Sequence, residues 1–393
     1  MRTAWLTIFL KEVRENLRDR KTVFNALVVG PLIGPLLMGL LFGAMLSREA
    51  KRADKPLELP VIAAERAPTL VNYLRTQNID IKTELPDDPE RAVREQDEEV
   101  ILRIPEKFTE NWQSGDAAPL ELIFDSSHQD THSAVARVTS AIEAYGRQTA
   151  ALRLLARGIH PVVSRPVNVV ERDQASPEAK GAMLLAFLPY FLILGAFMGG
   201  MYLAIDTTAG ERERQSLEPL LANPVPRWKI MAGKLLATAA FAIASLLLTL
   251  IAFAIVMPLL PLDRLGFKFN LSALVFVKML LVLSPVVILA AAVQTAVAAN
   301  SRSFREAQSW LGILNIIPAI PSMLLMVVPV KPMLWMFAVP LLGQHMSIMK
   351  LIRAEPIGYE QWAILLASGL LLSLAVASLA ARLYNRESLA VSA

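Results

Sequence analysis

Cysteine is absent from the 393 residues of this chain, and histidine occurs only four times. The lack of cysteine excludes disulfide bonds, thiolate metal sites and a cysteine nucleophile, and four histidines leave little material for a metal centre. Charged residues are also scarce, at 19% against about 25% in ordinary soluble domains. Hydrophobic residues instead make up 54% of the chain, and the mean hydropathy is +0.45. This composition predicts a membrane protein.

Six stretches that lack Asp, Glu, Lys and Arg are long enough to span a bilayer, for which a helix needs about 20 residues. They are residues 22–47, 181–205, 235–262, 279–301, 307–330 and 361–381. A seventh apolar run, 332–349, contains Pro340, Gly343, Gln344 and His345. Its length and polarity favour a re-entrant hairpin or interfacial element, within an extracytoplasmic region 331–360, over a seventh span.

The charges outside these stretches predict the orientation. Residues 48–180 have ordinary soluble composition and a net charge of −5, so the other 260 residues carry +9. Because Lys and Arg concentrate in the N-terminal tail and alternate short loops, both termini are expected in the cytoplasm, with 48–180 outside a bacterial inner membrane. The first span lacks a clean cleavage site and is expected to stay as an anchor. The basic pI of about 9.3 belongs to the membrane portion and does not indicate a nucleic-acid partner.

The segment 48–180 predicts a small α/β domain. Strand-like runs occur at 59–63, 79–82, 100–104, 120–124 and 162–170, and helix-like runs at 69–77, 88–96, 106–113 and 133–157. The overall expectation is an α-helical polytopic membrane protein of six transmembrane helices with an inserted extracytoplasmic α/β domain. His128 and His132 have the spacing of a zincin pair, but the required glutamate is replaced by Gln129. A helix start capped by Asp130 or Thr131 is the preferred interpretation over a metal site, and no G-x-S-x-G supports a hydrolase.

Residues 1–21 form an amphipathic segment. Its apolar residues are Trp5, Ile8, Phe9, Val13 and Leu17, and its polar face carries Lys11, Arg14, Glu15 and Arg18. This pattern is typical of a helix in the membrane interface that contacts lipid headgroups. A cytosolic helix packed on a partner is the compatible alternative.

The loop 206–234 is the most informative part of the chain. Its sequence predicts a charged helix over 211–221, a break at 223–226, and an amphipathic turn over 227–234 that leads into the third span. Charges followed by Leu217, Leu220 and Leu221 form a compact element with an apolar tip, suited to docking another protein. A solvated loop is the simpler alternative.

This loop resembles the G-E-R-E-x-x-x-L-E-x-L-L-x-x-P-V signature, with a later G-K, of type-2 ABC exporter permeases, specifically the sodium-efflux NatB-like branch. The matching residues are Gly210, Glu211, Arg212, Glu213, Leu217, Glu218, Leu220, Leu221, Pro224, Val225, Gly233 and Lys234. The resemblance implies that they couple the chain to an ATPase subunit. Pro219, between Glu218 and Leu220, departs from the pattern.

ATP chemistry is not expected in this chain. No G-x-x-x-x-G-K-[ST] P-loop occurs, because the Gly233–Lys234 pair is followed by Leu235. The chain is expected to have no catalytic residue, metal site or cofactor of its own, and ATP and magnesium would be bound by the partner ATPase. The resemblance also implies a homodimer with two ATPase copies.

The spans say less about cargo. None has an ionised residue near its middle, which disfavours proton-coupled transport. Polar residues that could line a pathway are Asn25, Tyr190, Ser245, Thr249, Gln294, Thr295 and Asn315. Hydrogen bonding between helices is the simpler explanation for each of them. Sodium efflux follows from the resemblance alone. Export of drugs, peptides or lipids stays open, as does a non-transporting mechanotransducer that acts through the external domain.

Overall fold

The computed structural model describes residues 4–54, 56–82, 84–164, 166–167, 170, 172–260, 272–328 and 330–384. The chain divides into two compact units. Met45–Arg172 is called here the inserted unit, and Met1–Ala44 with Asp173–Ala393 the membrane unit. The sequence placed the domain boundaries at 48 and 180.

The membrane unit confirms the six predicted spans. In the described residues, the helices long and apolar enough to cross a membrane are Phe24–Ser47, Leu185–Glu213, Arg227–Leu259, Ala273–Asn300, Phe304–Leu325 and Tyr359–Arg382. Their regular parts are α3 (Gly30–Asp54), α9 (Leu188–Ile205), α12 (Arg227–Val256), α13 (Ala273–Asn300), α14 (Phe304–Leu314) with α15 (Ala319–Val327), and α17 (Tyr359–Tyr384). The π-helix η1 (Phe24–Val29) precedes α3, and α8 (Pro177–Leu184) and η4 (Leu185–Phe187) precede α9.

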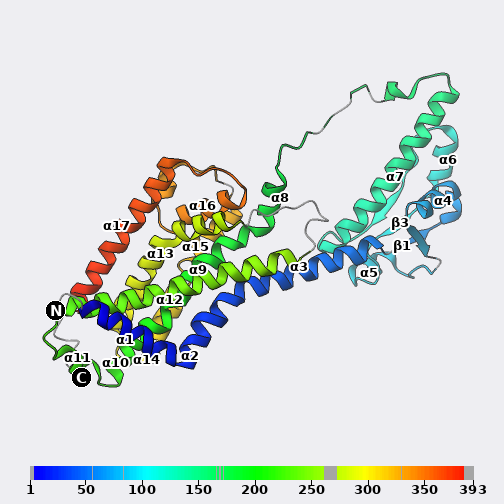
Figure 1. Ribbon diagram of the computed structural model, residues 1–393. Coiled ribbons are helices and arrows are strands. Elements are labelled where there is room, and N and C mark those ends of the chain that lie inside the picture. Colours follow the sequence, from blue (N-terminus) through cyan, green and yellow to red (C-terminus); the bar gives the residue numbers. More distant parts are fainter. Residues whose placement is uncertain are drawn as a thin grey trace. The chain divides into compact units, whose positions relative to one another are not determined.

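Helix α9 is the most buried of the spans and packs against α12 and α13 (Figure 1). Its glycines make this close approach possible. A Cβ on Gly199 would lie 2.4 Å from the Ser245 Cβ of α12, and one on Gly195 would lie 3.2 Å from the Thr249 Oγ1. The Gly-x-x-x-Gly spacing of residues 195–199 thus marks helix packing within this chain.

The fifth span is broken, which the sequence analysis did not predict. Helix α14 ends at Leu314 and α15 starts at Ala319. Pro318 is the N-cap of α15. A proline has no N–H to donate and disfavours helical geometry in the residue before it, so the helix stops there and restarts.

Residues 332–349 fold as a tight hairpin of short helices, η8 (Leu334–Ala338) and α16 (Leu342–Ile352). Leu341 has a positive φ of 71° at the turn. A Cβ on Gly343 would lie 2.6 Å from the Phe337 carbonyl oxygen, so glycine permits the two helices to meet. Most of α16 is buried, and its His345 Nδ1 lies 2.9 Å from the Ser322 Oγ of α15.

The inserted unit has the predicted α/β class, with a four-stranded sheet and flanking helices. The strand order is β2-β1-β3-β4, with β1 parallel to β2 and β3, and β4 antiparallel to β3. The strands are β1 (Leu57–Ile62), β2 (Ile79–Lys82), β3 (Ile101–Arg103) and β4 (Glu121–Ile123), and the helices are α4 (Pro68–Thr76), α5 (Pro89–Arg94), α6 (Lys107–Ser114) and α7 (Gln129–Ala156). The long α7 packs on α4 (Figure 1).

Two local predictions in this unit were wrong. The run 162–170 was expected as a strand, but Pro161–Ser164 forms a 3-10 turn, because Pro161 favours a helical start. Residues 165, 168 and 169 of that run lie outside the described residues. The N-cap of α7 is His128, not Asp130 or Thr131. The Gln96 Nε2 lies 2.8 Å from the His128 Nδ1, and the imidazole makes no capping hydrogen bond to the helix.

Candidate functional site

The loop that carries the family-like residues continues directly from the second span. Helix α9 passes into a π-helix, η5 (Asp206–Gly210), and then into one turn of α-helix, α10 (Glu211–Glu213). A separate short helix, α11 (Leu217–Leu221), follows. The single helix predicted over 211–221 is therefore wrong. Pro219 explains the break, because within a continuous helix it would lack the N–H bond to residue 215, whereas in the first turn of α11 it needs none.

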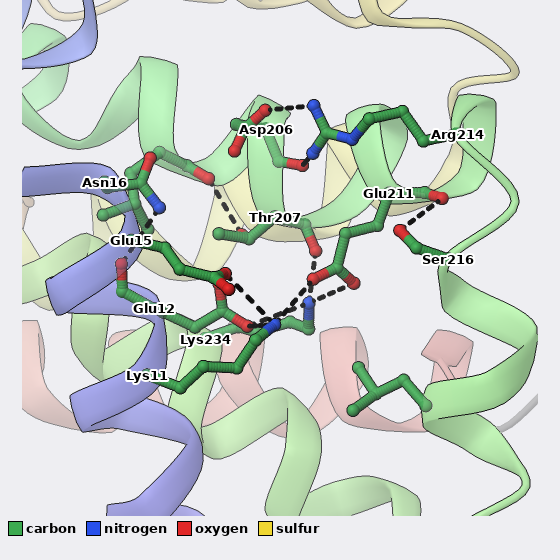
Figure 2. Close-up of polar contacts among 12 residues, drawn as sticks. Lys11, Glu12, Glu15, Asn16, Asp206, Thr207, Glu211, Arg214, Ser216 and Lys234 are labelled. Carbon is green, nitrogen blue, oxygen red and sulfur yellow. Dashed lines mark hydrogen bonds and ion pairs between the residues drawn. The ribbon is translucent and has the colours of Figure 1, made fainter. Parts of the chain in front are cut away.

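Lys234 of α12 lies at the centre of a buried ion cluster, shown in Figure 2. Its Nζ lies 2.6 Å from the Glu211 Oε2 and 3.4 Å from the Glu12 Oε1, and also donates to the Thr207 carbonyl. Lys234 has no exposed surface, and Glu12 and Glu211 are also buried. Such a cluster needs near-complete pairing, because an unpaired buried charge is strongly unfavourable.

Lys11 completes the cluster from α1 (Ala4–Arg18). Its Nζ lies 3.4 Å from the Glu12 Oε1, 3.5 Å from the Glu211 Oε1 and 3.3 Å from the exposed Glu15. The two lysines therefore balance the two buried glutamates. We call Lys11, Glu12, Glu211 and Lys234 the ion cluster.

Burial and charge act against each other in this cluster. Burial raises the pKa of Glu12, although the Lys234 ammonium opposes the shift. Burial alone would lower the pKa of Lys11, but the carboxylates of Glu12 and Glu211 outweigh it, so the pKa of Lys11 is raised. The positive charge on Lys11 is thereby held in place beside the loop.

Gly233 explains how α1 comes close enough to join the cluster. A Cβ at this position would lie 2.8 Å from both the Ile8 Cβ and the Trp5 carbonyl oxygen of α1. Ile8 packs with α12 in one apolar cluster, and Phe9 and Val13 pack with Phe241 of α12 in another. The apolar face that the sequence assigned to lipid is thus partly covered by the chain itself.

The charged residues next to Glu211 tie the loop to other parts of the membrane unit. The Glu213 Oε2 accepts a hydrogen bond of 2.7 Å from the Phe304 N–H at the first residue of α14, a favourable place for an anion. The Arg212 Nη1 donates to the Ser301 carbonyl at 3.4 Å. Arg214 pairs with Asp206 at 2.9 Å, and this hydrogen bond raises the pKa of Arg214.

The apolar half of the loop faces the protein more than was predicted. Leu217 is 4% exposed and, with the partly buried Leu220, packs in a cluster with Ile230 and Met231 of α12, and Ala380 of α17. It is therefore an anchor and not an exposed tip. The side chains of Glu218 and Leu221 lie outside the described residues.

One exposed stretch of the loop follows α11. Ala222, Asn223 and Pro224 are exposed, and Val225 is partly buried against the Leu217 cluster. Trp228, at the start of α12, is 53% exposed. With the exposed residues 213–216 and Pro219, they form the surface of the loop that remains open to a partner.

Sequence reasoning missed the polar residues of α1 that face inward. Glu12 and Asn16 were not singled out, yet both are buried. A signal was present, because Glu12 lies four residues after Ile8 and therefore on the apolar side of the helix. A charged residue on an apolar face indicates a buried partner, here Lys234.

The possible pathway residues differ in whether their side-chain polar atoms all have hydrogen-bond partners. The Thr249 Oγ1 donates to the Ser245 carbonyl at 2.9 Å and the Thr295 Oγ1 to the Ala291 carbonyl at 2.6 Å, so both are satisfied within their own helices. Tyr190 is partly buried, with its ring centroid 5.2 Å from that of Phe191. Asn25 is partly buried in η1.

Three buried side-chain oxygens in this region have no hydrogen-bond partner among the described residues. They are the Ser245 Oγ, the Gln294 Oε1 and the Asn315 Oδ1. The amide nitrogens of the last two are used: Gln294 donates to the Phe197 carbonyl of α9, and Asn315 contacts the Met201 sulfur at 3.2 Å. Gln294 and Asn315 thus bridge helices and still present a free oxygen.

The described residues contain no group of three or more His, Cys, Asp or Glu side chains placed to hold a metal ion. His128 instead lies 3.7 Å from the Asp125 carboxylate and within hydrogen-bond distance of Gln96.

Comparison with known proteins decides the family. The family model described as "ABC-2 family transporter protein" matches residues 27–384. The chain belongs to this family. It is 28% identical to the "ABC transporter permease protein NatB" of Bacillus subtilis (strain 168) over 345 aligned residues. The aligned region covers 86% of this chain and 87% of the relative. No solved structure matches the chain.

As an ABC-2 family member, the chain is the membrane permease subunit of an ABC transporter, and hydrolysis of ATP belongs to a partner ATPase. The predicted resemblance to NatB-like type-2 permeases is confirmed. Three features share one structural role in this subunit: the ion cluster, Gly233 and Leu217. Together they pack the loop after the second span, α1 and the third span into one element.

Proposed function

We propose that this ABC-2 permease exports sodium ions across the bacterial cytoplasmic membrane, driven by ATPase subunits that dock on the 206–234 loop. The similarity to NatB over most of both chains supports the choice of cargo. The observation that carries the proposal is the set of buried, uncharged and unpartnered oxygens in the membrane unit. Oxygen atoms are the ligands that hard cations prefer.

Two of these oxygens lie against adjacent glycines of α9. A Cβ on Gly199 would be 2.8 Å from the Ser245 Oγ, and one on the adjacent Gly200 would be 3.3 Å from the Gln294 Oε1. The glycines leave room for two uncharged side-chain oxygens, one beside each of two consecutive residues of α9. Neutral oxygens and backbone carbonyls are the donors with which transporters bind sodium.

The coupling route follows from the packing of the loop. An ATPase that contacts Asn223, Pro224 and Trp228 would move α11, and Leu217 and the ion cluster would transmit this movement to α12 and α1. We propose a homodimer of this chain with two ATPase copies, in which both termini and the loop are cytoplasmic and the inserted unit is outside.

The test is ATP-dependent sodium uptake into inside-out vesicles that contain this chain and its ATPase. Gln294→Leu is expected to lower sodium uptake by about tenfold while ATPase activity is retained, because it removes an oxygen ligand and keeps the side-chain size. Asn300→Leu is the matched control, since this amide is exposed at the end of the same helix. It is expected to transport normally.

Wild-type vesicles that hydrolyse ATP but accumulate no sodium would refute the cargo. ATPase stimulation by a lipid or drug in those vesicles would then favour organic export. If neither solute is moved, a mechanotransducer that acts through the inserted unit becomes the better explanation.

A further inference from the structure

The inserted unit contains a cavity of about 490 Å³ beside the C-terminal half of α7. Its size is that of a small-molecule site. It is lined mainly by α6, α7 and the segment that follows α6. Figure 1 shows α6 and α7 within this unit.

Aromatic side chains form one wall of the cavity. The Phe108, Trp112 and Tyr145 rings stack in sequence, with centroids 5.6 and 5.7 Å apart and planes within 13° and 11°. Tyr73 continues the row against Tyr145 at 5.4 Å. These are four of the five aromatic residues between Met45 and Arg172. Only Phe108 is fully buried, so Trp112 and Tyr145 still offer ring surface to the cavity.

Basic residues border this wall. Arg153 is held in place, because its guanidinium lies 4.4 Å from the Trp112 ring centroid and donates to the Trp112 carbonyl at 2.8 Å. Arg157 reaches the end of α6, where its Nη2 lies 3.5 Å from the Cβ position of Gly115. Within the described residues, neither the Arg157 guanidinium nor the Trp112 indole N–H has a hydrogen-bond partner. The cavity therefore has two unused donors.

The charge around the cavity is positive although the domain is acidic. Between Glu143 and Glu171 the chain has four arginines and no acidic residue. Asp116 also lines the cavity, but its carboxylate accepts a hydrogen bond from the Ser114 hydroxyl at 2.8 Å. With Arg153, Arg157 and Asp116 the rim carries a net positive charge, which complements an anion.

We propose that this cavity binds a small organic anion with a flat apolar body. The ring system would pack beside the exposed ring atoms of Trp112 and Tyr145, and its carboxylate or sulfonate would accept hydrogen bonds from the Arg157 guanidinium. An apolar ring system packs beside this aromatic row, and the Arg157 guanidinium supplies the directional contact that a neutral ligand would leave unused. The site is separate from the proposed sodium route and does not depend on it.

The test is isothermal titration of the full-length protein in lipid nanodiscs with 1-naphthoate, with empty nanodiscs as the blank. Saturable binding is expected, and Arg157→Gln is expected to weaken it about tenfold, because a charge-assisted hydrogen bond is lost. The neutral analogue 1-naphthamide is expected to bind more weakly to the wild type and equally to both proteins.

Arg147→Gln is the matched control. Arg147 is on the same helix, is exposed and pairs with Glu143 at 3.4 Å, but does not line this cavity. Its naphthoate affinity is expected to equal that of the wild type. Absence of saturable naphthoate binding, or equal affinity in the Arg157→Gln variant, would overturn the proposal. Tighter binding of L-tryptophan that is lost in Asp116→Asn would also overturn it, in favour of a zwitterionic ligand.

Discussion

Lys234 is a fully buried lysine of α12 whose ammonium group contacts both α1 and the 206–234 loop. The sequence placed it among the residues that couple the chain to an ATPase. The structure places its ammonium group out of contact with solvent, between carboxylates that come from α1 and from the loop. Within the chain, Lys234 therefore holds α1, the loop and α12 together. Coupling to a partner would act through these three segments.

Lys234→Met is expected to destabilise the membrane unit by about 3–5 kcal/mol, because it removes the buried cation of the cluster and leaves the two buried carboxylates of Glu12 and Glu211 with only the half-exposed Lys11. The measurement is thermal unfolding of the purified protein in detergent. The control is Lys278→Met, at an exposed lysine of α13 with no ion pair among the described residues. Adding Glu211→Gln to Lys234→Met is expected to recover part of the loss. Equal effects of the two lysine variants would contradict the account.

Glu12 predicts a dependence of stability on pH. Because the pKa of Glu12 is raised above 4.5 in the folded protein, the folded state binds this proton more tightly than the unfolded state. The contribution of Glu12 to the free energy of unfolding therefore increases as pH falls from neutrality towards 4.5. The stability of wild type relative to Glu12→Gln is expected to be greater at pH 5 than at pH 7, measured by unfolding temperature. A smaller difference at pH 5 would show that ion pairing, not burial, dominates this carboxyl.

At the scale of elements, the residues that decided the fold are those that end or separate helices. Pro219 divides the predicted helix 211–221, and Pro318 divides the fifth span into α14 and α15. Proline positions are visible in the sequence, but whether a helix kinks, restarts or stops depends on what accepts the freed backbone groups. The position of Gly233 is likewise visible in the sequence, but only the structure shows that α1 packs against it.

Gly233→Ala is expected to destabilise the protein by about 1–3 kcal/mol, because the new methyl group would overlap Ile8 and the backbone of Trp5. Gly312→Ala is the matched control, since a Cβ there meets nothing within 4 Å in the exposed face of α14. It is expected to raise stability by about 0.5–1 kcal/mol through helix propensity. Unfolding temperatures of both variants provide the comparison, and a neutral Gly233→Ala would mean that α1 can move aside at no cost.

At the scale of the whole molecule, the absence of cysteine becomes an experimental advantage. A single introduced cysteine is the only thiol, so a membrane-impermeant maleimide reports its side of the membrane directly. Gln113 of the inserted unit and Ala222 of the loop are both exposed.

Gln113→Cys is expected to react in intact cells, since the charge distribution predicts that the inserted unit lies outside. Ala222→Cys is expected to react only after the membrane is permeabilised. Labelling is read by mass shift on a gel, with the cysteine-free chain as the blank. The reverse pattern would invert the proposed topology.

The sequence by itself determined the six spans, the α/β class of the inserted unit and the family. These depend on local signals: hydrophobic length, alternation of strand and helix patterns, and a contiguous motif. Only the tertiary structure decided that Glu211 and Lys234 face each other and α1, that Leu217 is an anchor, and that Arg157 and Trp112 border one cavity. Those facts are pairings between residues far apart in the chain, and a side chain's role there depends on its neighbour in space, which no local pattern encodes.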